Sequence, residues 1–170
     1  MNVTVELQND CPEDWAPGND VMEHWLQLAT GQTAQLDLPC LVSVRIVGEQ
    51  DSSALNAQYR GKQRPTNVLS FPCTLPPGIS TALGSNPLGD IVLCAPVIAQ
   101  EARDQGKTLE AHWAHMLTHG FLHLQGYDHQ TEVTAREMEH LETVILDGLG
   151  FPDPYQPENA EVLTRGNLPS

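Results

Sequence analysis

The residues of this sequence that could do chemistry are histidines, and five of the seven lie between residues 112 and 129. The sharpest pattern among them is His119-x3-His123-x2-Gly126-x2-His129. Histidines at positions i and i+4 lie one above the other on a helix, so both imidazoles can reach one ion. A glycine can take the left-handed conformation that ends a helix, which would turn the chain so that His129 approaches from another direction. Three histidine ligands leave a fourth tetrahedral position open, which is typical of a catalytic zinc site.

The same ligand spacing occurs in the metzincin proteases, HExxHxxGxxH, but one position differs. Those enzymes use a glutamate directly after the first histidine as the general base, and this sequence has Gly120 there. Glycine transfers no proton, so a peptidase would lack its central residue. His115, one turn before His119, is the nearest candidate on the helix, either as a base or as a partner of a metal ligand. His112 is expected to be structural, and Asp128 either orients a ligand imidazole or faces solvent in a turn.

Three cations that could contact an anionic substrate form a basic island in the middle of the chain: Arg60, Lys62 and Arg64. No Asp or Glu occurs between Ser52 and Gly89, and a positive patch acts on phosphates only where carboxylates do not cancel it. A solvated loop is the alternative interpretation. The whole chain has a net charge of −14, which argues against a sequence-wide affinity for nucleic acid.

Hydrophobic periodicity predicts the elements that must position these residues. The helix expected at residues 108–126 is apolar nearly all round and should therefore be buried at the centre of the domain. The element order indicates an α+β fold, a single domain with a small mixed β-sheet covered by helices and a buried central helix that bears the zinc. The strands are expected at residues 2–8, 41–47, 66–71 and 88–94, and the other helices at 20–28, 51–61, 96–105 and 131–149.

Length and composition agree with one domain of ordinary size. The chain has 170 residues, of which 40% are apolar and 18% charged, so a substantial core can form. We expect a single catalytic domain over residues 1–150, a Pro- and Gly-rich surface loop at 75–87 and a loose tail at 151–170. No apolar run is long enough to span a bilayer, and the first residues do not have the pattern of a secretory signal. The four cysteines are widely spaced, which indicates reduced thiols in the cytoplasm.

With these residues identified, the chain resembles the YbeY family of bacterial rRNA-maturation endoribonucleases. The matching segments are HGFLHLQGYDH at residues 119–129, YRGKQRPTNVLSFP at 59–72 and LGDIVLC at 88–94. The resemblance implies a zinc-dependent, single-strand-specific endoribonuclease that acts in 16S rRNA 3′-end maturation and ribosome quality control. It also implies one zinc ion per chain on His119, His123 and His129, and Arg60 matches the functional arginine of the family.

These expectations define the site and the partners of the protein. Arg60 and His115 are the candidate catalytic residues, and Lys62, Arg64 and Ser70 are candidate substrate-binding residues. A guanidinium beside a metal would stabilise the charge that develops on a phosphoryl group, and either zinc-bound water or the neighbouring 2′-hydroxyl could attack. The expected partners are single-stranded 16S rRNA, the small ribosomal subunit and a basic ribosomal protein that meets the acidic C-terminal face. Two alternatives remain, a ribosome-assembly factor with a structural zinc and a zinc hydrolase of another substrate, peptides included.

Overall fold

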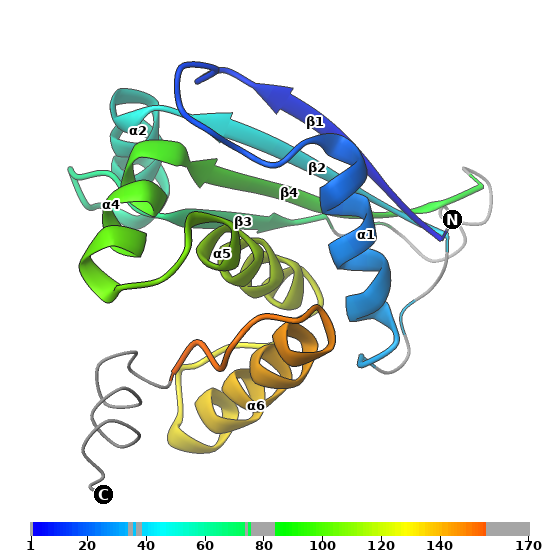
Figure 1. The fold of residues 1–170 in the computed structure, drawn as a ribbon. Coiled ribbons are helices and arrows are strands. Elements are labelled where there is room, and N and C mark those ends of the chain that lie inside the picture. Colours follow the sequence, from blue (N-terminus) through cyan, green and yellow to red (C-terminus); the bar gives the residue numbers. More distant parts are fainter. Residues whose placement is uncertain (1, 34–35, 37–38, 74, 76–83, 156–170) are drawn as a thin grey trace, which may run out of the picture.

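A mixed four-stranded sheet forms one layer of the molecule, with the strand order β1-β2-β4-β3 (Figure 1). Its strands are β1 (Val3–Asn9), β2 (Cys40–Val47), β3 (Val68–Pro72) and β4 (Asn86–Cys94). β1, β2 and β4 run parallel to one another, and β3 pairs antiparallel with β4 at the edge. This computed structural model describes residues 2–33, 36, 39–73, 75 and 84–155.

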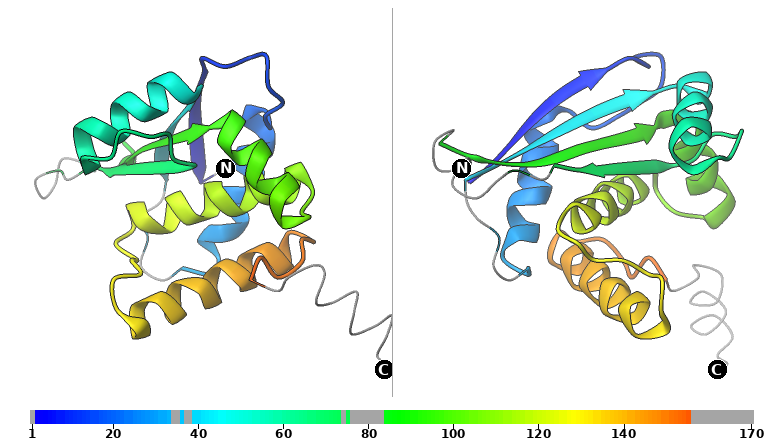
Figure 2. Two further views of the ribbon diagram at one scale, coloured as in Figure 1. Left: turned by 90° about the vertical axis from the view of Figure 1, so that its left-hand side faces the viewer. Right: turned by 180° about the vertical axis from the view of Figure 1, so that it is seen from behind.

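Helices cover the sheet unevenly. The helices of the described residues are α1 (Asn19–Thr30), α2 (Glu49–Arg60), α4 (Ala95–Gln105), α5 (Leu109–Leu124) and α6 (Glu132–Gly148). α1 and α5 lie against one face of the sheet, and α6 packs on the side of α5 that is turned away from the sheet (Figures 1 and 2). α2 lies on the opposite face at one end of the sheet, so that most of this outer face has no helix over it (Figure 2).

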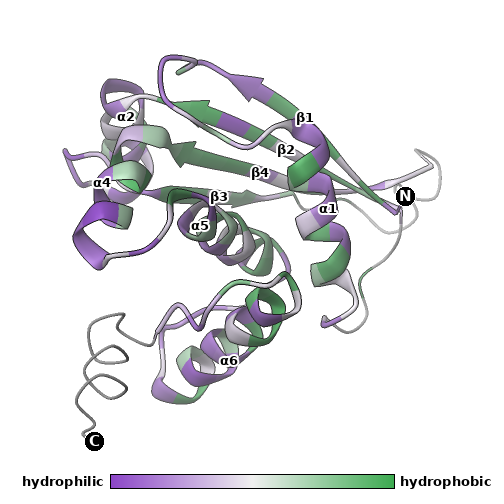
Figure 3. Cartoon of the chain, viewed as in Figure 1, coloured by the Kyte–Doolittle hydropathy of each residue, from purple (hydrophilic) through white to green (hydrophobic). Residues whose placement is uncertain are grey.

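The main core lies between the sheet and α5. In β2 the residues alternate, so that Val42, Val44 and Ile46 are fully buried toward this core, whereas Ser43 and Arg45 belong to the outer face. Figure 3 shows that β2, β4 and α5, which meet in this core, are rich in apolar residues. This alternation is the period of two that a half-covered strand requires.

The central helix α5 begins where the sequence predicts. Thr108 is its N-cap, and its hydroxyl oxygen accepts a hydrogen bond from the Ala111 amide at 3.1 Å, which satisfies a donor that the first turn leaves free. Most α5 residues are buried, including Trp113, Leu117 and Phe121. The prediction of an α+β domain with a small mixed sheet is confirmed, and the helix predicted over residues 108–126 is buried on nearly all sides.

Two segments that were expected to be irregular lie partly outside the described residues. Of the loop predicted at residues 75–87, residues 76–83 lie outside them, and Asn86 and Pro87 belong to β4. Of the tail predicted at 151–170, residues 156–170 lie outside them. The described part of that tail contacts the domain, since the Phe151 ring packs edge-on against Trp25 at a centroid distance of 5.9 Å.

None of the helices in the described ranges combines the length and the apolar character that a bilayer span requires.

Candidate metal centre

Three histidines gather at the end of α5, as the spacing predicts. His119 and His123 lie one turn apart on α5, and their Nε2 atoms are 3.1 Å apart. The ring of His129 stacks on that of His119 at a centroid distance of 5.5 Å. One ring nitrogen from each residue lies within 4.8 Å of the other two, a spacing at which they could hold a metal ion. His129 is exposed and the other two are half-buried, so the cluster opens to the surface.

The turn after α5 brings His129 to the helix. Gly126 has a φ of 98°, a left-handed conformation that glycine adopts at little cost. The Gly126 amide donates to the His123 carbonyl at 3.0 Å, and the Tyr127 amide donates to the Leu122 carbonyl at 3.2 Å. The predicted helix-ending role of Gly126 is therefore confirmed. Asp128 accepts a hydrogen bond from the Gln130 amide at 3.3 Å, which is a turn contact and not one with an imidazole.

A buried carboxylate from α6 lies behind the cluster. The side chain of Glu142 is fully buried, and its Oε2 lies 2.6 Å from Nδ1 of His119. Its Oε1 lies 2.9 Å from Nε2 of His115 and accepts a hydrogen bond from the Tyr155 hydroxyl. His115 therefore contacts Glu142 and not the three clustered imidazoles. Glu142 and Tyr155 were not among the residues predicted for this centre.

The surroundings shift the pKa values of these groups. Burial opposes ionisation of Glu142, but hydrogen bonds from His115 and His119 outweigh it and hold the pKa of this carboxyl at about 2. Burial lowers the pKa of His123 to about 4, and positive charge on His119, His129 and Arg60 acts in the same direction. A neutral imidazole and an ionised carboxylate are the forms that a metal centre uses.

The remaining buried histidine, His112, contacts a neighbouring helix. Nε2 of His112 lies 2.8 Å from Oε1 of Glu101 on α4. The same carboxylate accepts hydrogen bonds from the side-chain amide of Asn67 at 3.1 and 3.2 Å. His112 is 2% exposed. It thus links α5 to α4 and to the segment before β3, away from the three clustered histidines.

The position where a metzincin would have its glutamate lies against the sheet. A Cβ atom on Gly120 would lie 2.8 Å from Cγ2 of Ile91, 3.2 Å from Oγ of Ser70 and 3.3 Å from Cγ2 of Val68. No side chain fits there unless α5 moves away from β3 and β4. The hydroxyl of Ser70 donates to the Gly120 carbonyl at 3.2 Å, so this candidate substrate-binding residue joins β3 to the helix of the histidines.

The basic island begins at the C-terminal end of α2. Gly61 ends this helix with a φ of 71°, and Arg60, Lys62 and Arg64 are exposed. Side chains of α2 hold this loop. The side-chain amide of Asn56 donates to the Arg64 carbonyl at 2.8 Å, and the Ser52 hydroxyl donates to the Thr66 carbonyl and accepts from the Thr66 backbone amide. Within the described ranges no carboxylate forms an ion pair with the island. The end of α2 and the end of α5 lie on the same side of the molecule (Figure 2).

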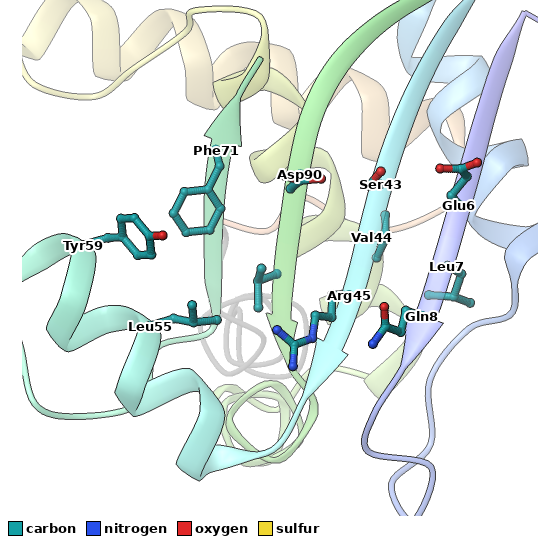
Figure 4. Close-up of a pocket in the computed structure, with 11 residues that line it drawn as sticks. Glu6, Leu7, Gln8, Ser43, Val44, Arg45, Leu55, Tyr59, Phe71 and Asp90 are labelled. Carbon is teal, nitrogen blue, oxygen red and sulfur yellow. The ribbon is translucent and has the colours of Figure 1, made fainter. Parts of the chain in front are cut away.

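A separate hollow lies on the outer face of the sheet. It measures about 650 Å³ and is lined by side chains from all four strands and from α2. Figure 4 shows Glu6, Ser43, Asp90 and Phe71 side by side across the strands, with Tyr59 facing Phe71. No histidine lines this groove, and the three clustered histidines belong to α5 and the turn after it, on the other side of the sheet.

Comparisons with known proteins agree with this geometry. The structure is similar to the solution structure of TM1509 from Thermotoga maritima, with a TM-score of 0.51 and 21% sequence identity, covering 91% of this chain and 99% of that one. The likeness shows a shared fold. The family model described as Endoribonuclease YbeY matches residues 7–150, which span the basic island, the three clustered histidines and Glu142. The chain belongs to the YbeY endoribonuclease family, and this membership implies endoribonuclease activity in rRNA maturation.

Proposed function

We propose that this protein is a zinc-dependent endoribonuclease that cleaves single-stranded RNA in the 3′-end maturation of 16S rRNA and in ribosome quality control, in the cytoplasm. The observation that supports this most is the three-histidine cluster, which opens to the surface on the side of the molecule where α2 ends at Arg60, the first residue of the basic island. Family membership supplies the substrate class.

His119, His123 and His129 would hold one zinc ion per chain. Three nitrogen ligands and an exposed side fit a catalytic zinc site, which keeps a coordination position free. When bound, zinc would supply Lewis acidity and lower the pKa of a water molecule. Magnesium is a poorer fit, because it prefers oxygen ligands.

Arg60 is proposed to bind the phosphate at the scissile bond. Its guanidinium is exposed, free of ion pairs with described residues, and close enough to contribute to the lowered pKa of His123. A planar guanidinium can donate two hydrogen bonds to phosphoryl oxygens. Lys62 and Arg64 would contact neighbouring phosphates, and Ser70 would hold β3 against α5 at the edge of the site.

His115 is proposed to act through Glu142 and not as the general base. Its Nε2 is engaged with the carboxylate, and the residue is 6% exposed. A general base must reach the proton it removes, which this buried ring does not do from its place behind Glu142.

The negative charge on the surface of α6 is the basis for proposing a protein partner. α6 presents the exposed acids Glu132, Glu137, Glu139 and Asp147, which would favour a basic ribosomal protein of the small subunit. Such a partner would bring a chain of net charge −14 to RNA.

A substrate comparison tests this function against its alternatives. The purified protein, loaded with zinc, would be incubated in parallel with single-stranded RNA, the matching duplex and an unstructured peptide. We expect cleavage of the single strand alone. Cleavage of the peptide would indicate a zinc hydrolase of another substrate, and a zinc-loaded protein that binds RNA without cleaving it would indicate an assembly factor.

A further inference from the structure

We propose that Glu142 and Tyr155 are positioning residues of the metal centre: Glu142 fixes the ring of His119, and the hydroxyl of Tyr155, from the segment after α6, fixes Glu142. The inference rests on the proposed metal site at His119, His123 and His129. It makes the described segment 151–155 a part of that site.

The two ring nitrogens of His119 have different partners. Its Nδ1 lies 2.6 Å from Oε2 of Glu142, and its Nε2 lies 3.1 Å from Nε2 of His123. An ionised carboxylate only accepts hydrogen bonds, so the Nδ1 atom of His119 carries the proton. Nε2 then keeps its lone pair for a metal ion, and one ring nitrogen from each of the three histidines lies within 4.8 Å of the other two. A carboxylate in this place sets the tautomer and orientation of a metal ligand and raises its basicity.

The second oxygen of Glu142 explains how the carboxylate keeps its place. Oε1 accepts hydrogen bonds from His115 Nε2 at 2.9 Å and from the Tyr155 hydroxyl. The side chain of Glu142 is fully buried, and a buried carboxylate is stable only with such donors. The two oxygens of Glu142 thus have different partners. Oε2 contacts His119, and Oε1 accepts hydrogen bonds from His115 and Tyr155.

Tyr155 reaches Glu142 because the described segment 151–155 packs against the domain. Phe151 packs on Trp25, and the Asp153 carboxylate accepts a hydrogen bond from the Tyr155 amide at 2.8 Å. The ring of Tyr155 packs edge-on against His115 at a centroid distance of 5.4 Å. Pro152 and Pro154 limit the conformations of the segment. The segment therefore does more than cover the core, because it also places a hydroxyl against the Glu142 carboxylate of α6.

Zinc affinity of the full-length chain tests the inference, with Zn²⁺ alone as the ligand and a competing chelator. We expect Glu142→Gln to weaken zinc binding 10- to 100-fold, the usual effect of losing such a partner. Tyr155→Phe removes one hydrogen bond and should weaken it by about 2- to 10-fold. Glu110→Gln is the matched control, because Glu110 is an exposed acid on α5, the helix of His119 and His123, and it should change the affinity less than 2-fold.

A second measurement does not depend on metal. The ¹⁵N shifts of the ring nitrogens in the zinc-free protein report which nitrogen of His119 is protonated. We expect Nδ1–H in the parent chain and a loss of this preference in Glu142→Gln. If Glu142→Gln fails to fold, Tyr155→Phe still tests the inference, because Tyr155 is 45% exposed and keeps its ring.

The outcomes separate two kinds of failure. Unchanged zinc affinity in the folded Glu142→Gln and Tyr155→Phe variants would overturn the inference while leaving the proposed metal site intact. A parent chain that binds no zinc would overturn the proposed metal site and, with it, the positioning role toward a metal. A proton on Nε2 of His119 in the parent chain would overturn the positioning role directly.

Discussion

Gly120 packs against Ile91 so closely that a Cβ atom on residue 120 would lie 2.8 Å from Cγ2 of Ile91. This contact lies one residue from His119, the first histidine of the cluster, where α5 packs on the sheet. It also explains in physical terms why the ligand spacing of a metzincin occurs here without its glutamate. A longer side chain at position 120 would point into the sheet and not toward the three histidines.

We therefore expect Gly120→Ala to destabilise the fold. The added methyl group would press on two β-branched side chains and on Ser70, and overpacking of this kind costs about 1–3 kcal/mol. Urea unfolding measures the change. Gly31→Ala is the control, because Gly31 has a φ of −70° and its Cβ would make only an ordinary contact of 3.5 Å. Equal stabilities of the two variants would show that α5 can move freely from the sheet.

Arg60→Ala should leave the fold and the zinc content unchanged and lower the cleavage of single-stranded RNA by roughly 10²–10³, the scale for losing one donor to a transition state. Arg60→Lys should recover only part of the rate, since an ammonium lacks the two-donor fork. Arg103→Ala removes an equal charge from the exposed side of α4 and should cleave like the parent chain. If Arg60→Ala also cleaves like the parent, Arg60 has only a helix-end role, worth about 0.3–1 kcal/mol of stability.

Binding of single-stranded RNA should depend weakly on salt. If the basic island is the whole footprint, roughly three phosphates are neutralised, and the slope of log K against log salt concentration should be about −2. Fluorescence anisotropy with a labelled RNA over a range of salt concentrations gives this slope. A slope several times steeper would mean that another surface binds the RNA.

The zinc-free protein should lose stability as the pH falls from about 6.5, the pKa of a histidine in an unfolded chain, toward the value of about 4 that burial gives the pKa of His123. In this window the unfolded chain binds a proton that the folded chain does not, so protonation favours unfolding. Urea unfolding at several pH values, with His123→Gln as the comparison, isolates this contribution. The stability of the parent relative to the variant should fall as the pH drops through this window, and a difference that stays constant would contradict the lowered pKa.

Local patterns of the sequence were sufficient to predict the element order and the three clustered histidines. The helix with Thr108 as its cap, the positive φ of Gly126 and the i, i+4 pair all depend on residues close together in the chain. Such features follow from helix geometry alone.

The contacts of Glu142 and Tyr155 with the histidines could not be predicted in the same way, because they depend on packing between segments that are distant in the chain. Glu142 meets His119 across 23 residues, and Tyr155 meets His115 across 40. One signal was present: Glu142 shares a helical stripe with the buried Met138 and Ile145, and a charged residue on an apolar stripe calls for a buried partner. Tyr155 gave no such signal, because its proline-containing segment has the composition of a loose tail.

The most direct test of the account is the zinc dependence of cleavage in one preparation. The purified chain would be assayed on single-stranded RNA as prepared, after zinc removal by a chelator, and after zinc is restored, with a His119→Ala, His123→Ala double variant alongside. The account predicts one zinc per parent chain, cleavage that disappears with the metal and returns with it, and neither zinc nor cleavage in the double variant. Undiminished cleavage by the zinc-free chain, or by the double variant, would contradict it.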